Sequence, residues 1–304
     1  MARRAPRPAI LSRMTPAPRD LIEVLAVPTV FTRRDLTDAG MSRRAIEAAL
    51  RDGRLIRLRR DRYARPTAAA EVLHAARIGG RVTCLTLLQM LGIFVLNVDA
   101  VHVHLERNRS RFRAVEHGSR IHWGAASSSP LAHVTLVAEA LRLSVRCQDP
   151  RSSLATLDSA LHLGFVTLDR LRSIFAGLPA RFHVLLGLVD GSAESGPETF
   201  MRVILRTMGV DFESQVVIPG VGRVDFLVEG WLIIECDSRA FHEGWDKQVA
   251  DRNRDIAAAR LGYVTVRPLA SDLIHRPDRI QAALRDILDA LGPGRRPQLR
   301  TAAR

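Results

Sequence analysis

Residues 224–238 read VDFLVEGWLIIECDS, two apolar runs that flank the turn pair Glu229-Gly230. Apolar β-formers on both sides of a two-residue turn predict a β-hairpin. Acidic residues interrupt or end both runs, although carboxylates rarely lie in such runs without a partner. The acids in question are Asp225, Glu235 and Asp237.

The predicted hairpin brings these acids together. Asp225 and Glu235 face each other on adjacent strands, and the two-residue period of a strand places Asp237 on the same face as Glu235. Clustered carboxylates repel one another unless a cation intervenes, and oxygen-rich sites select Mg²⁺ or Mn²⁺. Such an ion polarises a phosphoryl oxygen and lowers the pKa of bound water. The pattern therefore predicts a phosphodiester-hydrolysing site. Each acid alone is explained as well by pairing with Arg223, Arg239 or Arg252, so the prediction depends on the joint pattern.

The N-terminal part predicts a winged helix over residues 20–66. Thr32 and Ser42 are placed to cap two helices, and Gly40 ends the first of these. The predicted helices and strands are Asp20–Ala26, Asp35–Ala39, Arg43–Arg51, Leu55–Leu58 and Arg62–Ala64.

Charge is unevenly distributed along the chain, whose formal net charge is +13. Residues 1–65 contain 16 arginines and seven acids, for a net charge of +9, whereas residues 190–292 carry −5. A basic winged helix suits DNA binding through phosphate contacts, although this fold also serves as a protein-interaction module. The predicted DNA-binding residues of this part are Arg43, Arg44, Arg57, Arg59, Arg60 and Arg62.

Residues 67–190 predict a middle α/β domain with no evident chemistry. Its alternating run Val101–Leu105 predicts a strand with His102 and His104 on one face. No neighbouring cysteine or carboxylate in the sequence completes a metal set, so we interpret this face as solvated. The chain's three cysteines are odd in number and far apart, and we interpret them as ordinary buried thiols. The remaining predicted elements are helices at Glu71–Ile78, Leu85–Leu91, Leu131–Leu143, Leu154–Leu163 and Leu168–Phe175.

The C-terminal motif resembles the PD-(D/E)xK restriction-endonuclease-like superfamily, because Asp225 precedes Glu235-Cys236-Asp237 and Glu198 lies in a preceding helix. The run from Ile234 to Arg267 is similar to a very-short-patch-repair-like domain. This resemblance implies metal ligation by Glu198, Asp225 and Glu235. It also implies that Asp237 orients the attacking water, that His242 acts as a general base or proton donor, and that phosphate is contacted by Arg252 and Arg254. The sequence departs from the pattern at Ser238, where a glycine is usual, and it has no catalytic lysine.

The upstream winged helix and middle domain resemble the AbiEi-type antitoxin arrangement. We therefore expect a mixed α/β (α+β) protein that binds DNA and carries a Mg²⁺- or Mn²⁺-dependent endonuclease domain with a mixed sheet flanked by helices. The alternative is an antitoxin-like transcriptional regulator whose nuclease-like domain is inactive, with a cognate toxin or a second copy as partner. Lacking an apolar signal core or a membrane-length apolar run, the chain is expected in the cytoplasm. The expected divisions are a flexible basic arm at 1–19, the winged helix at 20–66, the middle domain at 67–190, the endonuclease-like domain at 191–292 and a disordered basic tail at 293–304.

Overall fold

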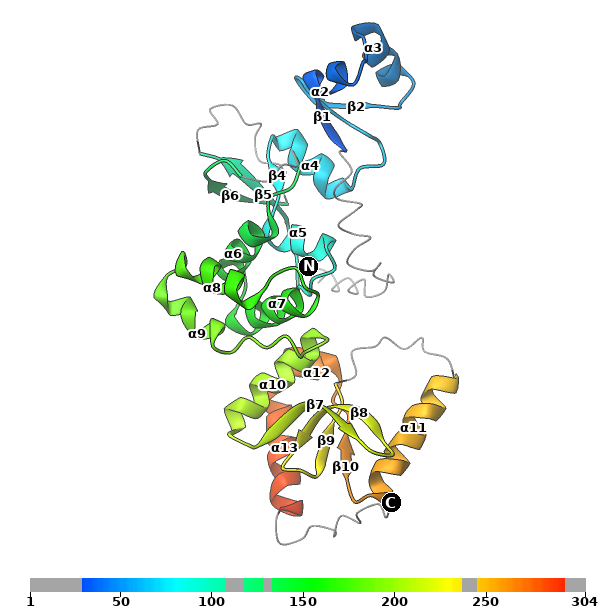
Figure 1. Ribbon diagram of the computed structural model, residues 1–304, viewed down its shortest axis with the longest axis vertical. Coiled ribbons are helices and arrows are strands. Elements are labelled where there is room, and N and C mark those ends of the chain that lie inside the picture. The colour runs from blue at the N-terminus through cyan, green and yellow to red at the C-terminus, as the bar shows by residue number, and fades with distance from the viewer. Residues whose placement is uncertain (1–28, 108–117, 128–132, 237–244, 293–304) are drawn as a thin grey trace, which may run out of the picture. The chain divides into compact units, whose positions relative to one another are not determined.

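The computed structural model describes residues 29–107, 118–127, 133–236 and 245–292. They divide into two compact units, and the boundary along the chain falls between Gly191 and Ser192. The architecture is mixed α/β, as the sequence predicts, with three separate sheets (Figure 1). Within the described ranges, no helix combines the length and the apolar character that crossing a membrane requires.

The first unit opens with a small antiparallel sheet and two helices, the layout of a winged helix. The sheet has the order β1-β3-β2. Thr32 forms a capping box with Asp35 at the first helix, and the Ser42 hydroxyl accepts a hydrogen bond from the amide of Ala45 at the second. The caps predicted at Thr32 and Ser42 are thus confirmed. The elements are β1 (Val30–Thr32), α2 (Arg33–Asp38), α3 (Arg43–Arg51), β2 (Ile56–Arg59) and β3 (Arg62–Ala64).

The winged helix has a small core of its own but also shares the main core of the unit. Leu36, Ile46 and Tyr63 pack together between its helices and sheet. Leu58 and Ala64 belong instead to the large hydrophobic cluster of the middle region. The helix predicted at Asp20–Ala26 lies outside the described residues.

The rest of the first unit packs helices against a second three-stranded sheet of order β4-β5-β6. β5 pairs antiparallel with β4 and parallel with β6. The elements are α4 (Ala70–Ile78), β4 (Arg81–Val82), α5 (Cys84–Met90), β5 (Val101–Glu106), β6 (Ser119–Gly124), α6 (Val137–Cys147), α7 (Pro150–His162), α8 (Leu168–Ala176), the 3₁₀ turn η1 (Ala180–Phe182) and α9 (His183–Leu186).

The helix predicted at Leu131–Leu143 is wrong over residues 133–136, and its first two residues lie outside the described ranges. Val82 and Val134 form a β-bridge, and the Thr135 amide donates to the carbonyl of Val82. Residues 133–135 therefore extend along β4, and α6 begins only at Val137. The apolar periodicity that suggested a longer helix reflects burial of this extended segment.

The second unit contains a four-stranded mixed sheet of order β10-β9-β8-β7. The three consecutive strands β7, β8 and β9 are antiparallel, and β10 returns parallel to β9 after α11. Helix α11 lies on one side of the sheet, and α10, α12 and α13 gather on the other (Figure 1). The elements are α10 (Gly196–Met208), β7 (Phe212–Ile218), β8 (Gly222–Val228), β9 (Leu232–Ile234), α11 (Trp245–Arg260), β10 (Val264–Val266), α12 (Ala270–His275) and α13 (Pro277–Leu291).

The predicted hairpin is present in this sheet. Glu229 and Gly230 both have left-handed backbone angles, with φ of 51° and 70°. Two consecutive residues of this kind match the tight turn whose twist suits a two-residue hairpin. The acid-bearing strands β8 and β9 are therefore neighbours.

Candidate functional site

One basic surface of the winged helix is assembled from three of its elements. Arg33 of α2, Arg43 of α3 and Arg57 of β2 line a hollow of about 340 Å³. Arg43 donates to Glu47 of the same helix at 2.9 Å. Arg44 is exposed next to it in the first turn of α3. The start of α3 thus presents arginines to solvent, as the sequence predicts.

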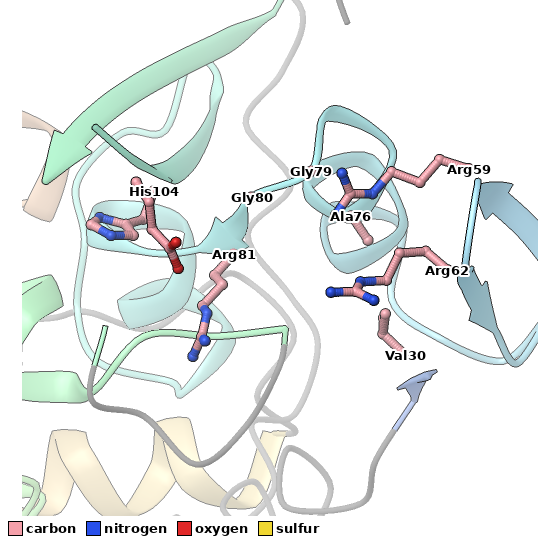
Figure 2. Close-up of a pocket in the computed structure, with 9 residues that line it drawn as sticks. Val30, Arg59, Arg62, Ala76, Gly79, Gly80, Arg81 and His104 are labelled. Atoms are coloured by element: carbon pink, nitrogen blue, oxygen red, sulfur yellow. The ribbon is translucent and has the colours of Figure 1, made fainter. Parts of the chain in front are cut away.

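The wing arginines divide into two groups. Arg57 and Arg60 are exposed. Arg59 and Arg62 instead line a cavity of about 300 Å³, together with Arg81 of β4 (Figure 2). In this structure only the first group of the wing is freely presented to a nucleic acid.

The acidic cluster, defined here as Glu198, Asp225 and Glu235, lies in the second unit. Glu198 is in the first turn of α10, where the Ser195 hydroxyl caps the helix. Its side chain is buried, and Oε2 accepts hydrogen bonds from the Glu194 amide at 2.8 Å and from the side-chain amide of Gln215 at 2.9 Å. These contacts fix the carboxylate toward the sheet.

Asp225 and Glu235 come from adjacent strands. Phe226 pairs with Ile234, so continuing the register by one residue places Asp225 opposite Glu235. Oδ2 of Asp225 accepts a hydrogen bond from the Cys236 amide at 2.7 Å. The hairpin therefore brings the two acids together in the way the sequence predicts.

Gln215 is a member of this site that sequence reasoning missed. It has a left-handed backbone, with φ of 55°, and the β7–β8 pairing is interrupted between Gln215 and Asp225. Its amide nitrogen donates to Glu198, whereas its buried Oε1 has no hydrogen-bond partner among the described residues. A polar residue on a strand gives no sequence signal for such a role. The unpartnered oxygen is a donor atom of the kind that hard cations accept.

The three carboxyls influence one another electrostatically. Burial raises the pKa of Glu198, Asp225 and Glu235 above their ordinary values. The negative charge of Asp225 contributes to the raised pKa of both other acids. Like charges that share a poorly solvated site favour the protonated form. The described ligand atoms of these three acids nevertheless do not all lie within 4.8 Å of one another.

The site has no lysine, but two arginines lie next to its acid Glu235. Arg254 of α11 donates to Glu235 Oε1 at 3.0 Å and also reaches the carbonyl of Arg223. Arg267, just after β10, pairs with Asp255 at 2.9 Å and lies 3.9 Å from Glu235. Arg254 was predicted to contact phosphate or pair with the acids, and here it pairs. Arg267 could have been found from its place directly after a strand parallel to β9.

The remaining predicted site residues are less well placed. Arg252 is exposed on α11. Asp237 and His242 lie outside the described residues, so their roles as water-orienting acid and general base stay predictions. Binding of Mg²⁺ or Mn²⁺ likewise stays a prediction, which rests on the oxygen atoms that the acidic cluster offers as ligands.

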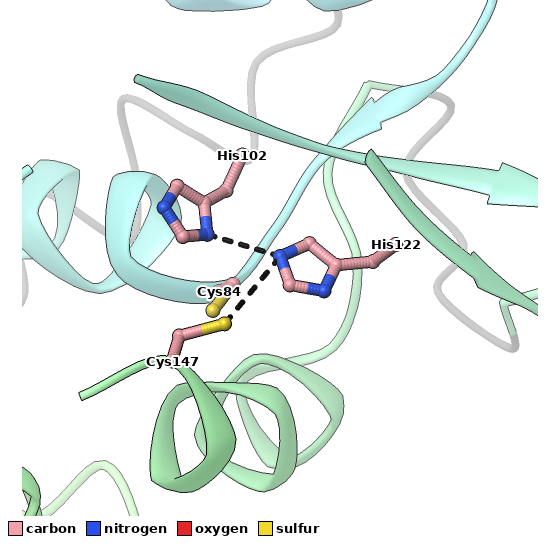
Figure 3. A group of neighbouring side chains, drawn as sticks. All are labelled: Cys84, His102, His122 and Cys147. Atoms are coloured by element: carbon pink, nitrogen blue, oxygen red, sulfur yellow. Dashed lines mark hydrogen bonds between the residues drawn. The ribbon is translucent and has the colours of Figure 1, made fainter. Parts of the chain in front are cut away.

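A second cluster lies in the first unit, where the sequence predicted a solvated histidine face and ordinary thiols. His102 is buried, with an exposed fraction of 2%, and its Nδ1 lies 3.0 Å from Nε2 of His122. Cys84 and Cys147 lie against the two rings (Figure 3). The solvated interpretation is therefore wrong for His102. It failed because β6, which carries His122, was not predicted.

The thiols of this cluster have unlike environments. Burial raises the pKa of the Cys84 thiol. A hydrogen bond from Cys84 lowers the pKa of the Cys147 thiol, and bonds from His102 and His122 act in the same direction. His104, on the same strand, is separate from the cluster and contacts the Ala125 carbonyl at 2.9 Å.

Comparison with known proteins bears on the winged helix. Residues 20–66 match the family described as "Transcriptional regulator, AbiEi antitoxin". This match covers the winged helix and supports the antitoxin-type resemblance of that part of the chain.

The relatives match more of the chain, but their descriptions state no activity. Two proteins of Mycobacterium tuberculosis, from strains CDC 1551 and H37Rv, are described as uncharacterized. Each is 28% identical over 82% of this chain and 98% of its own length. A crystal structure of the RV2827C protein from the same species covers 88% of this chain and 97% of its own, with 14% identity and a TM-score of 0.32.

Proposed function

We propose that this protein is a DNA-binding transcriptional regulator of the antitoxin kind. The observation that carries the proposal is the basic surface formed by Arg33, Arg43 and Arg57, from three elements of a winged helix that matches a regulator family. In helix-turn-helix proteins the second helix enters the major groove with its N-terminal residues near base edges. Here that helix is α3.

The arginines of helix α3 and those of the wing make different contacts with DNA in this proposal. Arg43 and Arg44 lie at the start of α3, where they reach base edges or the flanking phosphates. Arg57 and Arg60 of the wing are exposed and contact the phosphate backbone. Glu47 holds Arg43 in the free protein and releases it to DNA. A cognate toxin, as a second partner, follows from the antitoxin resemblance of residues 20–66.

Binding to the protein's own promoter fragment tests this function. Fluorescence anisotropy would compare wild type with an Arg43→Ala/Arg44→Ala double variant. We expect affinity to fall at least tenfold, since each lost base or phosphate contact costs about 1–3 kcal/mol. Arg170→Ala, an exposed arginine on α8, is the matched charge control and should bind as wild type does. Equal affinity of the double variant and the control would contradict the proposal.

The second candidate function is metal-dependent cleavage of DNA by the acidic cluster. It is favoured by one observation, the unpartnered Oε1 of Gln215, whose side-chain amide contacts Glu198, one of three acids with raised pKa. Asp225 and Glu235 would hold Mg²⁺ or Mn²⁺, and Glu198 would contact it directly or through water. The ion would activate water and polarise the phosphate. Arg254 already neutralises Glu235, which favours an inactive domain and places this function second.

Supercoiled plasmid distinguishes the two candidates. Wild type would be incubated with and without Mg²⁺ or Mn²⁺ beside Asp225→Asn and Glu235→Gln. Glu213→Gln, an exposed acid on β7, is the matched control. Cleavage by wild type and the control, but not by the two site variants, supports the nuclease. If all of the proteins leave the plasmid intact and still bind the promoter fragment, the nuclease function is excluded and the regulator function is retained.

A further inference from the structure

A group of four side chains in the first unit has the composition of a zinc site. Cys84, His102, His122 and Cys147 each present one ligand atom, and these atoms all lie within 4.8 Å of one another (Figure 3). No other set of three or more such residues meets this criterion within the described ranges. Two cysteines and two histidines are a usual ligand set of structural zinc.

We propose that Cys84, His102, His122 and Cys147 bind one zinc ion. Zinc–nitrogen bonds of about 2.0–2.1 Å and zinc–sulfur bonds of about 2.3 Å imply ligand separations of roughly 3.3–3.8 Å in a tetrahedron. The His102–His122 nitrogen distance is 3.0 Å and the Cys147–His122 distance is 3.9 Å. These two separations lie on either side of the required range, and all four ligand atoms lie within 4.8 Å of one another.

The fold delivers the four ligands from four different elements. Cys84 begins α5, His102 is on β5, His122 is on β6 and Cys147 ends α6. In the parallel β5–β6 pair, His104 lies opposite His122, so the two ligand histidines are diagonal neighbours across the strands. The convergence depends on the whole unit and not on one local motif.

Hydrogen bonds hold α5 and β5 in register around the cluster. The Thr83 amide donates to the His102 carbonyl at 3.0 Å, and the His102 amide donates to the Thr86 hydroxyl at 2.8 Å. Thr83 and Thr135 hydroxyls are 2.8 Å apart. Metal ligands are commonly positioned by such outer contacts.

Cys84 also has strained backbone geometry. Its φ of 51° lies in the left-handed region, which is unfavourable for a residue with a Cβ atom. The residue is fully buried. Strain of this kind costs about 1–3 kcal/mol and clusters at functional sites. At Cys84 it aims the thiol toward Cys147 and the two imidazoles.

The site is closed and structural. All four tetrahedral positions are filled by protein, so none remains for water or substrate. The ion would bind the edge strand β6 to α5 and α6 in addition to its backbone pairing with β5. Because the ligands converge only in the folded chain, zinc binding stabilises the first unit.

Metal analysis of the full chain tests the proposal. Protein purified without a histidine tag would be gel-filtered and measured by inductively coupled plasma mass spectrometry. We expect about one zinc per chain in wild type and almost none in Cys147→Ser or His122→Asn. The matched controls are Cys236→Ser, the third thiol, and His104→Asn, the neighbouring histidine, and both should retain zinc. Zinc content that is equal in the ligand variants and the controls, or absent from wild type, overturns the site.

Two measurements on the wild-type protein test the site even if the ligand variants fail to fold. Cobalt exchanged into the protein should show the visible absorption of a tetrahedral ion and thiolate-to-cobalt charge transfer. Thiol titration after denaturation without reductant should find all three cysteines reactive. A disulfide between Cys84 and Cys147 would leave only Cys236 reactive and, with no cobalt spectrum, would overturn the proposal.

Discussion

Nη2 of Arg254 lies 3.0 Å from Oε1 of Glu235. The same guanidinium donates to the carbonyls of Val221 and Arg223, at 3.2 and 2.6 Å. One side chain of α11 therefore binds the beginning of β8 and the acid that follows β9. It supplies a positive charge next to the acidic cluster.

Replacing Arg254 with methionine should destabilise this part of the sheet. Glu235 would lose its closest cation and two backbone carbonyls would lose donors, so we expect a cost of about 1–3 kcal/mol. Hydrogen–deuterium exchange of peptides covering β8 and β9 measures the local free energy. Arg260→Met, an exposed position at the end of the same helix, is the control and should change little. Unchanged protection in Arg254→Met would show that the contact is not stabilising.

Glu198 should make the second unit less stable as pH rises. Burial raises its folded pKa above the ordinary value of 4.5, so the folded state holds this proton more tightly than the unfolded state does. Stability from this group is full below about pH 4.5 and is lost as pH rises through the folded pKa. Glu198→Gln mimics the protonated form and should remove that loss.

Thermal unfolding from pH 4 to 7 without added magnesium measures this effect, and Glu213→Gln controls for loss of an exposed acid. Wild type and Glu198→Gln should converge at low pH and separate at neutral pH, with the variant more stable. A variant that is less stable than wild type at about pH 7 would mean that the ionised carboxylate is favoured by its hydrogen bonds.

Local patterns predicted most elements, because caps and periodicity act over a few residues. Helix α3 has the predicted bounds, since Ser42 caps it and its apolar residues recur on one face. That Asp225 and Glu235 lie close together also followed from the sequence, because a tight turn makes β8 and β9 neighbours. The register itself differs by one residue from that of a two-residue turn, because Val228 pairs with Leu232, and this shift places Asp225 opposite Glu235. The contact between Glu198 and Gln215 did not follow from the sequence, because it joins a helix to a strand whose ladder is broken there.

The Cys/His cluster was missed for a related reason. Consecutive ligands of the cluster are 18, 20 and 25 residues apart in the sequence, and the four ligands come from four elements. Short-range metal motifs have no counterpart here. Predicting the cluster requires β6, whose SRIHWG sequence lacks the clean alternation of a half-buried strand.

Gly80 should tolerate no side chain. A Cβ there would overlap Cγ1 of Val103 and would lie only 2.5 Å from the carbonyl oxygen of His104. The second contact is backbone, so relief requires moving β5, and we expect Gly80→Ala to cost about 1–3 kcal/mol. Urea unfolding of the first unit measures the loss. Gly187→Ala, whose new Cβ would lie 3.7 Å from the nearest atom, is the control and should be nearly neutral. Equal midpoints for the two variants would refute the steric argument.

The wing should contribute phosphate contacts that depend on salt and not on sequence. Arg57 is exposed on β2 and shares the basic hollow with Arg43. Removing one phosphate contact should lower the slope of log affinity against log salt concentration by about 0.9. We therefore expect Arg57→Ala to weaken promoter and unrelated DNA equally, whereas Arg44→Ala should weaken the promoter more. Anisotropy titrations at several salt concentrations test this, with Arg170→Ala as the control. A wing variant that retains the wild-type slope would exclude Arg57 from the DNA contact.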